Sequence, residues 1–176
     1  MSKLVQINKD HVTSDQASVS LTGINQDCVY VVVLSAVTPV SDSQELRMRV
    51  TKSGSEDTTS NYDCAANEIK AHTTFGGIAR QNDDYFKLDS NTGTATGECI
   101  NKIVTLYNFY DSSQDSSFSY ISSFNNQSTN LYANTGGGVH TVASASDGVH
   151  FYFASGDIAK GQFTLYKMED WYELYT

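Results

Sequence analysis

The stretch DGVHFYFASGDIAKGQFTLYKM, which spans Asp147–Met168, decides the fold class of this chain. In its two runs VHFYF, at 149–153, and QFTLYKM, at 162–168, the character of the side chains alternates with a period of two residues. Such alternation is typical of β-strands that bury one face. Gly156 and Gly161 lie between the two runs, and glycine is a common turn residue. The stretch therefore predicts two antiparallel strands joined as a hairpin.

The same alternation recurs outward from this stretch. In QELRMRVT, at 44–51, Leu46 and Val50 share one side while charged side chains occupy the other, which indicates a half-buried strand. The run CVYVVVLSAV, at 28–37, is apolar on both sides and predicts a central strand, which Pro39 ends because proline has no N–H to donate. Further strands are predicted at 4–8, 18–22, 84–88, 98–109, 117–123 and 139–143.

About ten strands at this spacing are typical of an antiparallel sandwich or barrel. We predict an all-β fold with a single antiparallel β-sandwich domain, jelly-roll-like, over residues 1–168, followed by an aromatic C-terminal tail at 169–176. The segment Ala65–His72 can form either a short helix or a strand. Asn125–Gly138 is predicted to be a long polar loop, with its Gly136–Gly138 triplet as a flexible turn.

Composition and charge exclude several classes of protein. The chain has 176 residues and a formal net charge of -9. This balance argues against a nucleic-acid binder, which needs clustered lysine and arginine, and against an anionic membrane surface as partner. No apolar run has the length of a membrane span, and the first ten residues lack an apolar signal core, so we expect synthesis in a cytoplasm. The distant cysteines Cys28, Cys64 and Cys99 are predicted to be thiols.

No catalytic, cofactor-binding or metal-binding motif stands out, so we predict a protein that is not an enzyme. One arrangement places His140 and His150 across a hairpin from each other, with both imidazoles on one face. The favoured interpretation is that they are a pair of surface or rim histidines. The segment DSNTG at Asp89–Gly93 resembles the start of a calcium loop, but Ile100 occupies the position of the bidentate glutamate. An Asx-type turn between strands is therefore the favoured interpretation of Asp89.

The tail EDWYELYT, at 169–176, carries the candidate interface residues Trp171, Tyr172, Leu174 and Tyr175. Three interpretations remain open: the tail folds back onto its own sandwich, it docks onto a neighbouring subunit, or it forms a stacking platform for sugar rings. Tryptophan and tyrosine are common interface anchors, which supports docking. An N-terminal arm at 1–10 could serve the same role.

Several stretches carry a resemblance to a known family. They are LRMRVTKSGSED at 46–57, NYD at 61–63, GTATGECINKIVTLYNF at 93–109, GGGVHT at 136–141 and the stretch at 147–168 with which this section began. Together they resemble the small β-sandwich virion structural proteins of tailed phages, best known from phages that infect marine cyanobacteria. This chain departs from the family pattern at Lys167, where the family usually has glycine, and by continuing through Trp171.

The resemblance implies a non-enzymatic virion structural protein and therefore localisation in the virion. The favoured role is a capsid decoration or cement protein on the particle surface, with the major capsid protein as its main partner among the virion proteins, and with formation of a homo-oligomer. The alternative role is a tail-fibre or knob module that binds a host-surface glycan through the loop at 125–138. The family pattern supplies no catalytic or ligand-binding residue that can be placed in this sequence.

Overall fold

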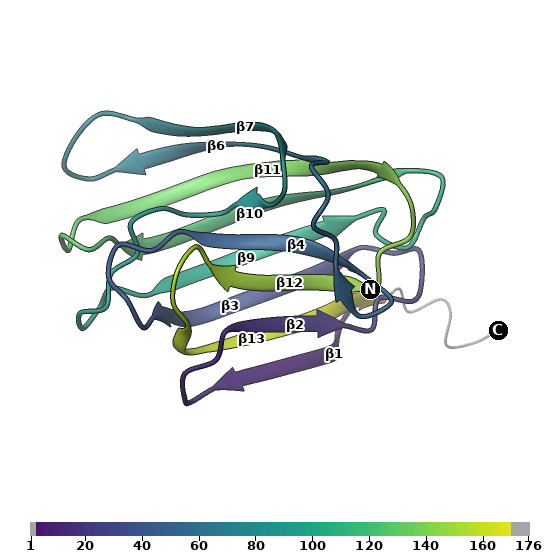
Figure 1. Cartoon of the computed structure of the whole chain (residues 1–176), viewed down its shortest axis with the longest axis horizontal. Helices are drawn as coiled ribbons and strands as arrows, with labels where there is room; N and C mark the ends of the chain where they lie inside the picture. Colours follow the sequence, from purple (N-terminus) through teal and green to yellow (C-terminus); the bar gives the residue numbers. More distant parts are fainter. Residues whose placement is uncertain (1–2, 170–176) are drawn as a thin grey trace.

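A computed structural model describes residues 3–169, which form two antiparallel β-sheets packed face to face (Figure 1). The large sheet has the strand order β1-β13-β3-β9-β10-β11-β6-β7. The small sheet has the order β2-β12-β4-β5, and β8 also pairs with β4. The strands are β1 (Lys3–Val12), β2 (Ser18–Thr22), β3 (Tyr30–Pro39), β4 (Leu46–Lys52), β5 (Ser55–Glu56), β6 (Tyr62–Lys70), β7 (Gly76–Asp83), β8 (Phe86–Lys87), β9 (Ile100–Tyr107), β10 (Asp115–Asn125), β11 (Leu131–Ala143), β12 (Gly148–Phe153) and β13 (Ile158–Glu169).

The prediction of an all-β antiparallel sandwich is confirmed, with thirteen strands in place of about ten. Of the three additional strands, β5 is only two residues long, and β6 covers most of the segment left open between helix and strand. The strand predicted at 84–88 is the two-residue strand β8. The third additional strand, β7, has the sequence GGIARQND, in which polar residues and glycine mask the alternation. It lies at the edge of the large sheet, and Ile78 is its one buried side chain. Pro39 is the last residue of β3, as predicted.

The predicted hairpin between 149–153 and 162–168 is wrong. β12 pairs with β2 and β4 in the small sheet, whereas β13 pairs with β1 and β3 in the large sheet. The chain therefore crosses from one layer to the other between Phe153 and Ile158. Phe151 and Phe163 then face each other across the core with ring centroids 5.6 Å apart. Alternation identifies the buried side of each strand, but it does not specify whether two strands lie edge to edge or face to face.

The predicted loop at 125–138 is also wrong, because β11 begins at Leu131 and runs through the glycine triplet. The triplet pairs with β10 on one side and with β6 on the other. A Cβ atom on Gly136 would lie 2.4 Å from the Cβ of Ala66, so the inward side of this row has no room for a side chain. Here glycine permits close packing of strands and does not mark a turn. The segment Ala65–His72, left open between helix and strand, is a strand through Lys70.

Residues Lys3–Asp10 of the predicted N-terminal arm are not an extended arm. They belong to β1, the edge strand that pairs with β13 along its length (Figure 1). β13 ends at Glu169, one residue beyond the predicted domain boundary, and Glu169 pairs with Lys3. The last strand therefore has partners on both sides, because β3 occupies its other edge.

Apolar side chains from both sheets form one continuous core. The large sheet contributes Val32 and Val104, and the small sheet contributes Met48 and Phe151, all fully buried. An aromatic cluster extends this core beneath β6 and β10, where the ring centroids of Phe86 and Phe118 are 4.6 Å apart. Burial of this apolar surface is the main favourable contribution to folding, and it leaves each sheet with one outward side.

Candidate functional site

The outward side of the large sheet carries a row of uncharged side chains. Directly paired residues in antiparallel strands point to the same side of a sheet. Val33 of β3 pairs with Ile103 of β9, which pairs with Ile121 of β10. The row continues through Thr135 of β11 to Asn67 of β6. This single row therefore crosses five strands without a charged residue.

Neighbouring rows have the same character. We define the uncharged face as the outward residues of these five strands: Val31, Val33, Ala65, Asn67, Ile69, Asn101, Ile103, Thr105, Tyr107, Ser117, Ser119, Ile121, Ser123, Ala133, Thr135, Gly137 and Val139. In these described strands, the acidic residues Asp63 and Asp115 lie together at one end of the face. Lys70, Glu68 and Lys102 belong to the inward rows. The centre of the face thus presents only apolar groups, hydroxyls and amides.

Apolar side chains at the middle of the uncharged face are open to solvent. Ile121 is 60% exposed and Ile103 is 45% exposed. They line a shallow depression together with Val33, Ser35 and Asn101. Adjacent exposed isoleucines on a strand pair are a feature of interaction surfaces, because removal of apolar side chains from water by a partner is energetically favourable.

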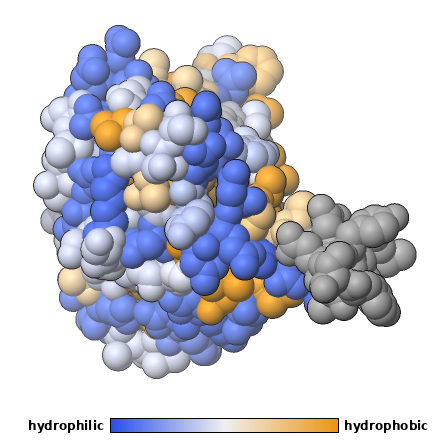
Figure 2. Space-filling model, turned by 90° about the vertical axis from the view of Figure 1, so that its right-hand side faces the viewer, coloured by the Kyte–Doolittle hydropathy of each residue, from blue (hydrophilic) through white to orange (hydrophobic). Residues whose placement is uncertain are grey.

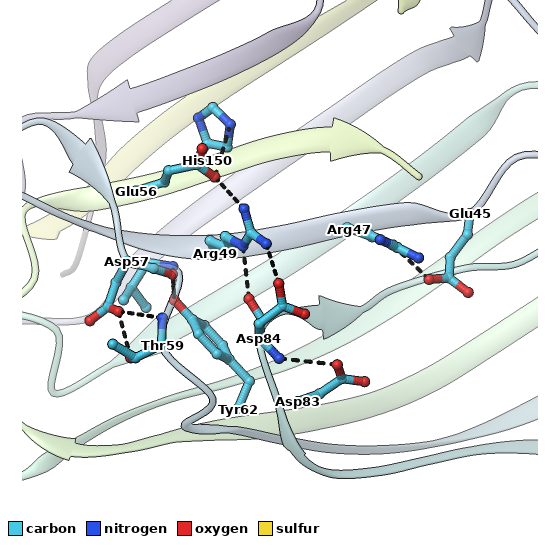
Figure 3. Close-up of polar contacts among 11 residues, drawn as sticks. Glu45, Arg47, Arg49, Glu56, Asp57, Thr59, Tyr62, Asp83, Asp84 and His150 are labelled. Atoms are coloured by element: carbon cyan, nitrogen blue, oxygen red, sulfur yellow. Dashed lines mark hydrogen bonds and ion pairs between the residues drawn. The ribbon is translucent and has the colours of Figure 1, made fainter. Parts of the chain in front are cut away.

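The outward side of the small sheet differs, because it carries charged side chains that contact one another (Figure 3). Arg49 of β4 donates from Nη1 to Glu56 at 2.7 Å and from Nη2 to Asp84 at 2.5 Å. Its guanidinium also lies over the ring of Tyr152 on β12. His150, next to it in the sheet, lies 3.6 Å from the same Glu56 carboxylate. Arg49 therefore joins β4, β5, β12 and the segment before β8.

A second group on this side is centred on Glu45. Arg47 donates to Glu45 at 2.8 Å, and Lys87 approaches the other carboxylate oxygen at 2.5 Å. The Arg47 guanidinium also lies 3.9 Å from the ring centre of Tyr85. Partial burial acts to raise the pKa of Glu45, but the hydrogen bonds from Lys87 and Arg47 outweigh it and lower that pKa. Both arginines of the small sheet are thus paired with carboxylates of the same chain, so the charged groups on this side already have partners without another molecule.

The two outward sides therefore have opposite character. In the end view of Figure 2, hydrophilic residues cover most of one side of the molecule and hydrophobic patches gather toward the other. Of the chain's 11 basic residues, Arg47, Arg49 and Lys87 lie on the outer side of the small sheet. This asymmetry is the clearest functional feature of the fold.

A polar hollow lies at one end of the sandwich. We define the rim hollow by its lining residues: Asn25, Gln26, Asp27, Cys28, Tyr110, Lys167, Met168 and Glu169. Tyr110 is 46% exposed there. Lys167 contacts Gln26 and lies 3.1 Å from Glu169. An exposed aromatic ring grouped with amides and a carboxylate is a common composition of sugar-binding sites.

A buried polar cluster occupies the core beneath β9 and β10. Asp89, fully buried, accepts hydrogen bonds from Lys102 and from Asn134, and Ser122 lies 3.4 Å from the same oxygen. The predicted Asx-type turn at Asp89 is therefore wrong, because its carboxylate points into the core. Lys102 gave no sequence signal of its own beyond its place in a strand, where it occupies an inward position between Ile100 and Val104.

The predicted surface or rim position is wrong for His140, and the two histidines do not share a face. His140 lies on β11 in the large sheet and is fully buried, whereas His150 lies on β12 in the small sheet. Burial and the nearby Lys52 ammonium lower the pKa of His140, and the Asp57 carboxylate at 3.5 Å opposes that shift only in part. Cys28, Cys64 and Cys99 are not paired in a disulfide. The candidate interface residues Trp171, Tyr172, Leu174 and Tyr175 lie outside the described residues.

Comparison of the chain with protein-family models and with curated proteins finds no match. Between residues 3 and 169, no helix is long and apolar enough to cross a membrane. In the same part of the chain, no group of three or more histidine, cysteine, aspartate or glutamate residues is arranged to hold a metal ion.

Proposed function

We propose that this protein is a non-enzymatic structural component of a virus particle, most simply a decoration protein, which binds a neighbouring virion subunit through its uncharged face. The observation that carries the proposal is the contrast between the two outward sides of the sandwich. One side pairs its charges internally, and the other exposes isoleucine, serine and threonine across five strands. A molecule that repeats on a particle can bury the second side and leave the first in water.

The charge of the chain supports this orientation. With a net charge of -9, two copies or a copy and an acidic lattice repel each other at long range. Contact through a surface without charge avoids placing like charges opposite each other and avoids the cost of desolvating ions. The acidic residues Asp63 and Asp115, at one end of the face, then lie at the rim of the contact, where water still reaches them.

The resemblance of five sequence stretches to virion proteins of tailed phages supports the particle as the setting, and the major capsid protein as the main partner. Closed symmetry on a particle repeats one contact many times, so a modest interface per subunit is sufficient for stable attachment. The same argument allows a homo-oligomer of the chain to form the unit that attaches.

The test uses a pair of variants that add the same charge at positions of similar chemistry. Ile121→Lys places a cation at the centre of the uncharged face, where the side chain is 60% exposed. Val40→Lys makes the same change at a residue that is 44% exposed and lies after the end of β3, away from the face. Both variants should fold, because neither position is in the core. Incorporation into particles should be lost for Ile121→Lys and kept for Val40→Lys.

Equal incorporation of both variants would rule out the uncharged face as the contact. Hydroxyl-radical footprinting provides a second readout without substitution. Tyr107 and Ile121 should be protected in assembled particles relative to the isolated protein, while the half-buried His150 and Tyr152 on the small sheet should react equally in both. Protection of the small sheet alone would reverse the proposed orientation.

A second candidate function is glycan binding as a tail-fibre or knob module, and the rim hollow favours it. The loop once expected to form such a site is largely strand, but Tyr110 with Asn25 and Asp27 offers a ring for stacking and polar groups for sugar hydroxyls. Tyr110→Ala should abolish retention on a host-surface glycan array, while Tyr107→Ala on the uncharged face should not. Absence of retention for the unaltered protein would exclude this function.

A further inference from the structure

Lys102 and Asp89 form an ion pair that is entirely enclosed by the sandwich. The side chains of both residues are 0% exposed, and Nζ of Lys102 lies 3.1 Å from Oδ2 and 3.3 Å from Oδ1 of Asp89. Lys102 projects from β9 of the large sheet. Asp89 follows Leu88, whose amide donates to the carbonyl of Leu46 on β4 of the small sheet. The pair therefore spans the two layers.

The surroundings hold the two groups in place and separate them from water. The Lys102 ammonium lies 3.6 Å from the ring centre of Tyr120 and donates to the Leu88 carbonyl at 3.2 Å. Asn134 donates to Oδ1 of Asp89 at 3.0 Å. Oδ2 accepts no hydrogen bond from the described residues, although the Lys102 nitrogen lies beside it. The two carboxylate oxygens of Asp89 are thus unequal.

Burial also makes an ion pair at this position expensive. Desolvation lowers the pKa of Lys102 to about 8, against the opposing effect of Asp89, and it raises the pKa of Asp89. Both shifts favour transfer of a proton from the ammonium to the carboxylate, and such a transfer would leave a neutral amine beside a neutral carboxylic acid. An unprotonated amine is a nucleophile, and the carbon of a neutral carboxyl group is a far better electrophile than that of a carboxylate.

We propose that Lys102 and Asp89 condense to an isopeptide bond that joins the two sheets covalently. A bond forms between Nζ of Lys102 and Cγ of Asp89, and the bond between Cγ and Oδ2 breaks. The ammonium gives up two protons, and both leave with Oδ2 as one water molecule, so that atoms and charge balance without an oxidant or a cofactor. The product is a secondary amide that retains one N–H.

The described residues account for each requirement of this condensation. Enclosure fixes the reacting atoms in contact, which replaces a bimolecular encounter by an intramolecular one with a high effective concentration. Negative charge develops on Oδ1 during attack, where the Asn134 amide already donates. Exclusion of bulk water from the enclosed pair limits hydrolysis of the amide once it has formed. The amide also removes two buried charges, which relieves their desolvation cost.

Tryptic peptide mapping of the purified, full-length protein tests this proposal. Trypsin requires an unmodified lysine, so the unmodified chain is cut after both Lys87 and Lys102 and releases the peptide 88–102 at its full mass. The linked chain is not cut after Lys102, and the longer peptide that results is lighter by one water molecule. Tandem mass spectrometry should then place the loss on a bond between Asp89 and Lys102.

Lys102→Arg is the matched control, because arginine keeps the cation but cannot form this amide. That variant should be cut after residue 102 and should have the full mass. Persistence of the water loss in Lys102→Arg would assign it to a succinimide at Asp89 and overturn the proposal. Cleavage after Lys102 in the unaltered protein, with full peptide mass after prolonged incubation of the folded protein, would overturn it as well.

Discussion

Replacement of Lys102 by methionine removes one partner of the buried pair and keeps the length of the side chain. Asp89 would then lie in the core with no cation beside it, because the described groups that touch it are otherwise the neutral Asn134 and Ser122. Removal of one member of a buried ion pair costs about 3–5 kcal/mol. For a chain of this size, about 2–4 °C of melting temperature corresponds to 1 kcal/mol. We therefore expect the melting temperature of Lys102→Met at pH 7 to fall by roughly 6–20 °C.

The loss should depend on pH in a direction set by Asp89. Burial raises the pKa of Asp89 in the folded protein above its ordinary value of 3.8, and without Lys102 that pKa rises further. A group whose folded pKa is raised destabilises the fold above its unfolded pKa, and this penalty disappears as the pH falls through the folded pKa. The deficit of Lys102→Met relative to the unaltered protein should therefore shrink between pH 7 and pH 4.

Thermal and urea unfolding of three variants measures the effect. Lys102→Met/Asp89→Leu removes both charges and should recover most of the lost stability, because an apolar pair can replace a buried ion pair without penalty. Lys160→Met, at an exposed position of β13, should differ from the unaltered protein by less than about 0.5 kcal/mol. If the unaltered protein carries an isopeptide bond at Lys102, Lys102→Met also loses the stability that this bond provides, by an amount that does not vary with pH. If Lys102→Met were as stable as the unaltered protein at pH 7, the reasoning would be refuted.

Three further predictions concern other parts of the core. The pKa of His140 in the folded protein lies below its ordinary value of 6.5, so the neutral imidazole supports the fold above pH 6.5 and this support is lost as the pH falls. The free energy of unfolding should therefore drop less between pH 7 and pH 5 for His140→Gln than for the unaltered protein. Gly136→Ala should lower the free energy of unfolding in urea by about 1–3 kcal/mol through overpacking. Gly77→Ala should be nearly neutral, because its Cβ would lie 3.4 Å from its nearest neighbour, the Ala66 carbonyl oxygen. Tyr62→Phe should cost about 1 kcal/mol, because its hydroxyl accepts from the Val50 amide of the opposite sheet.

Local alternation was sufficient to predict most long strands and the two-layer class of the fold. The central strand ending at Pro39 and the half-buried strand beginning at Leu46 both lie where their patterns place them. Strand partners were not accessible in this way. β12 and β13 follow each other in sequence yet lie in opposite sheets, because their phenylalanines meet across the core and not along an edge.

The candidate sites were harder to predict than the fold. The uncharged face exists only once five strands, distant in sequence, are set in register, since each strand alone shows an ordinary polar side. The glycine triplet was misassigned because glycine favours turns by local preference, while its role at Gly136 depends on the approach of a neighbouring strand. Asp89 was misassigned because its partner Lys102 lies in a different sheet element, and no spacing rule connects them.

Copy number in purified particles tests the central claim most directly. Quantitative mass spectrometry of intact virions, with the major capsid protein as internal reference, should find this protein in a fixed ratio to the capsid protein, as expected for a subunit that covers the lattice through its uncharged face. A number near that of the tail proteins would move the protein to a tail appendage and favour the rim hollow as its binding site. Absence from the particles would contradict the account.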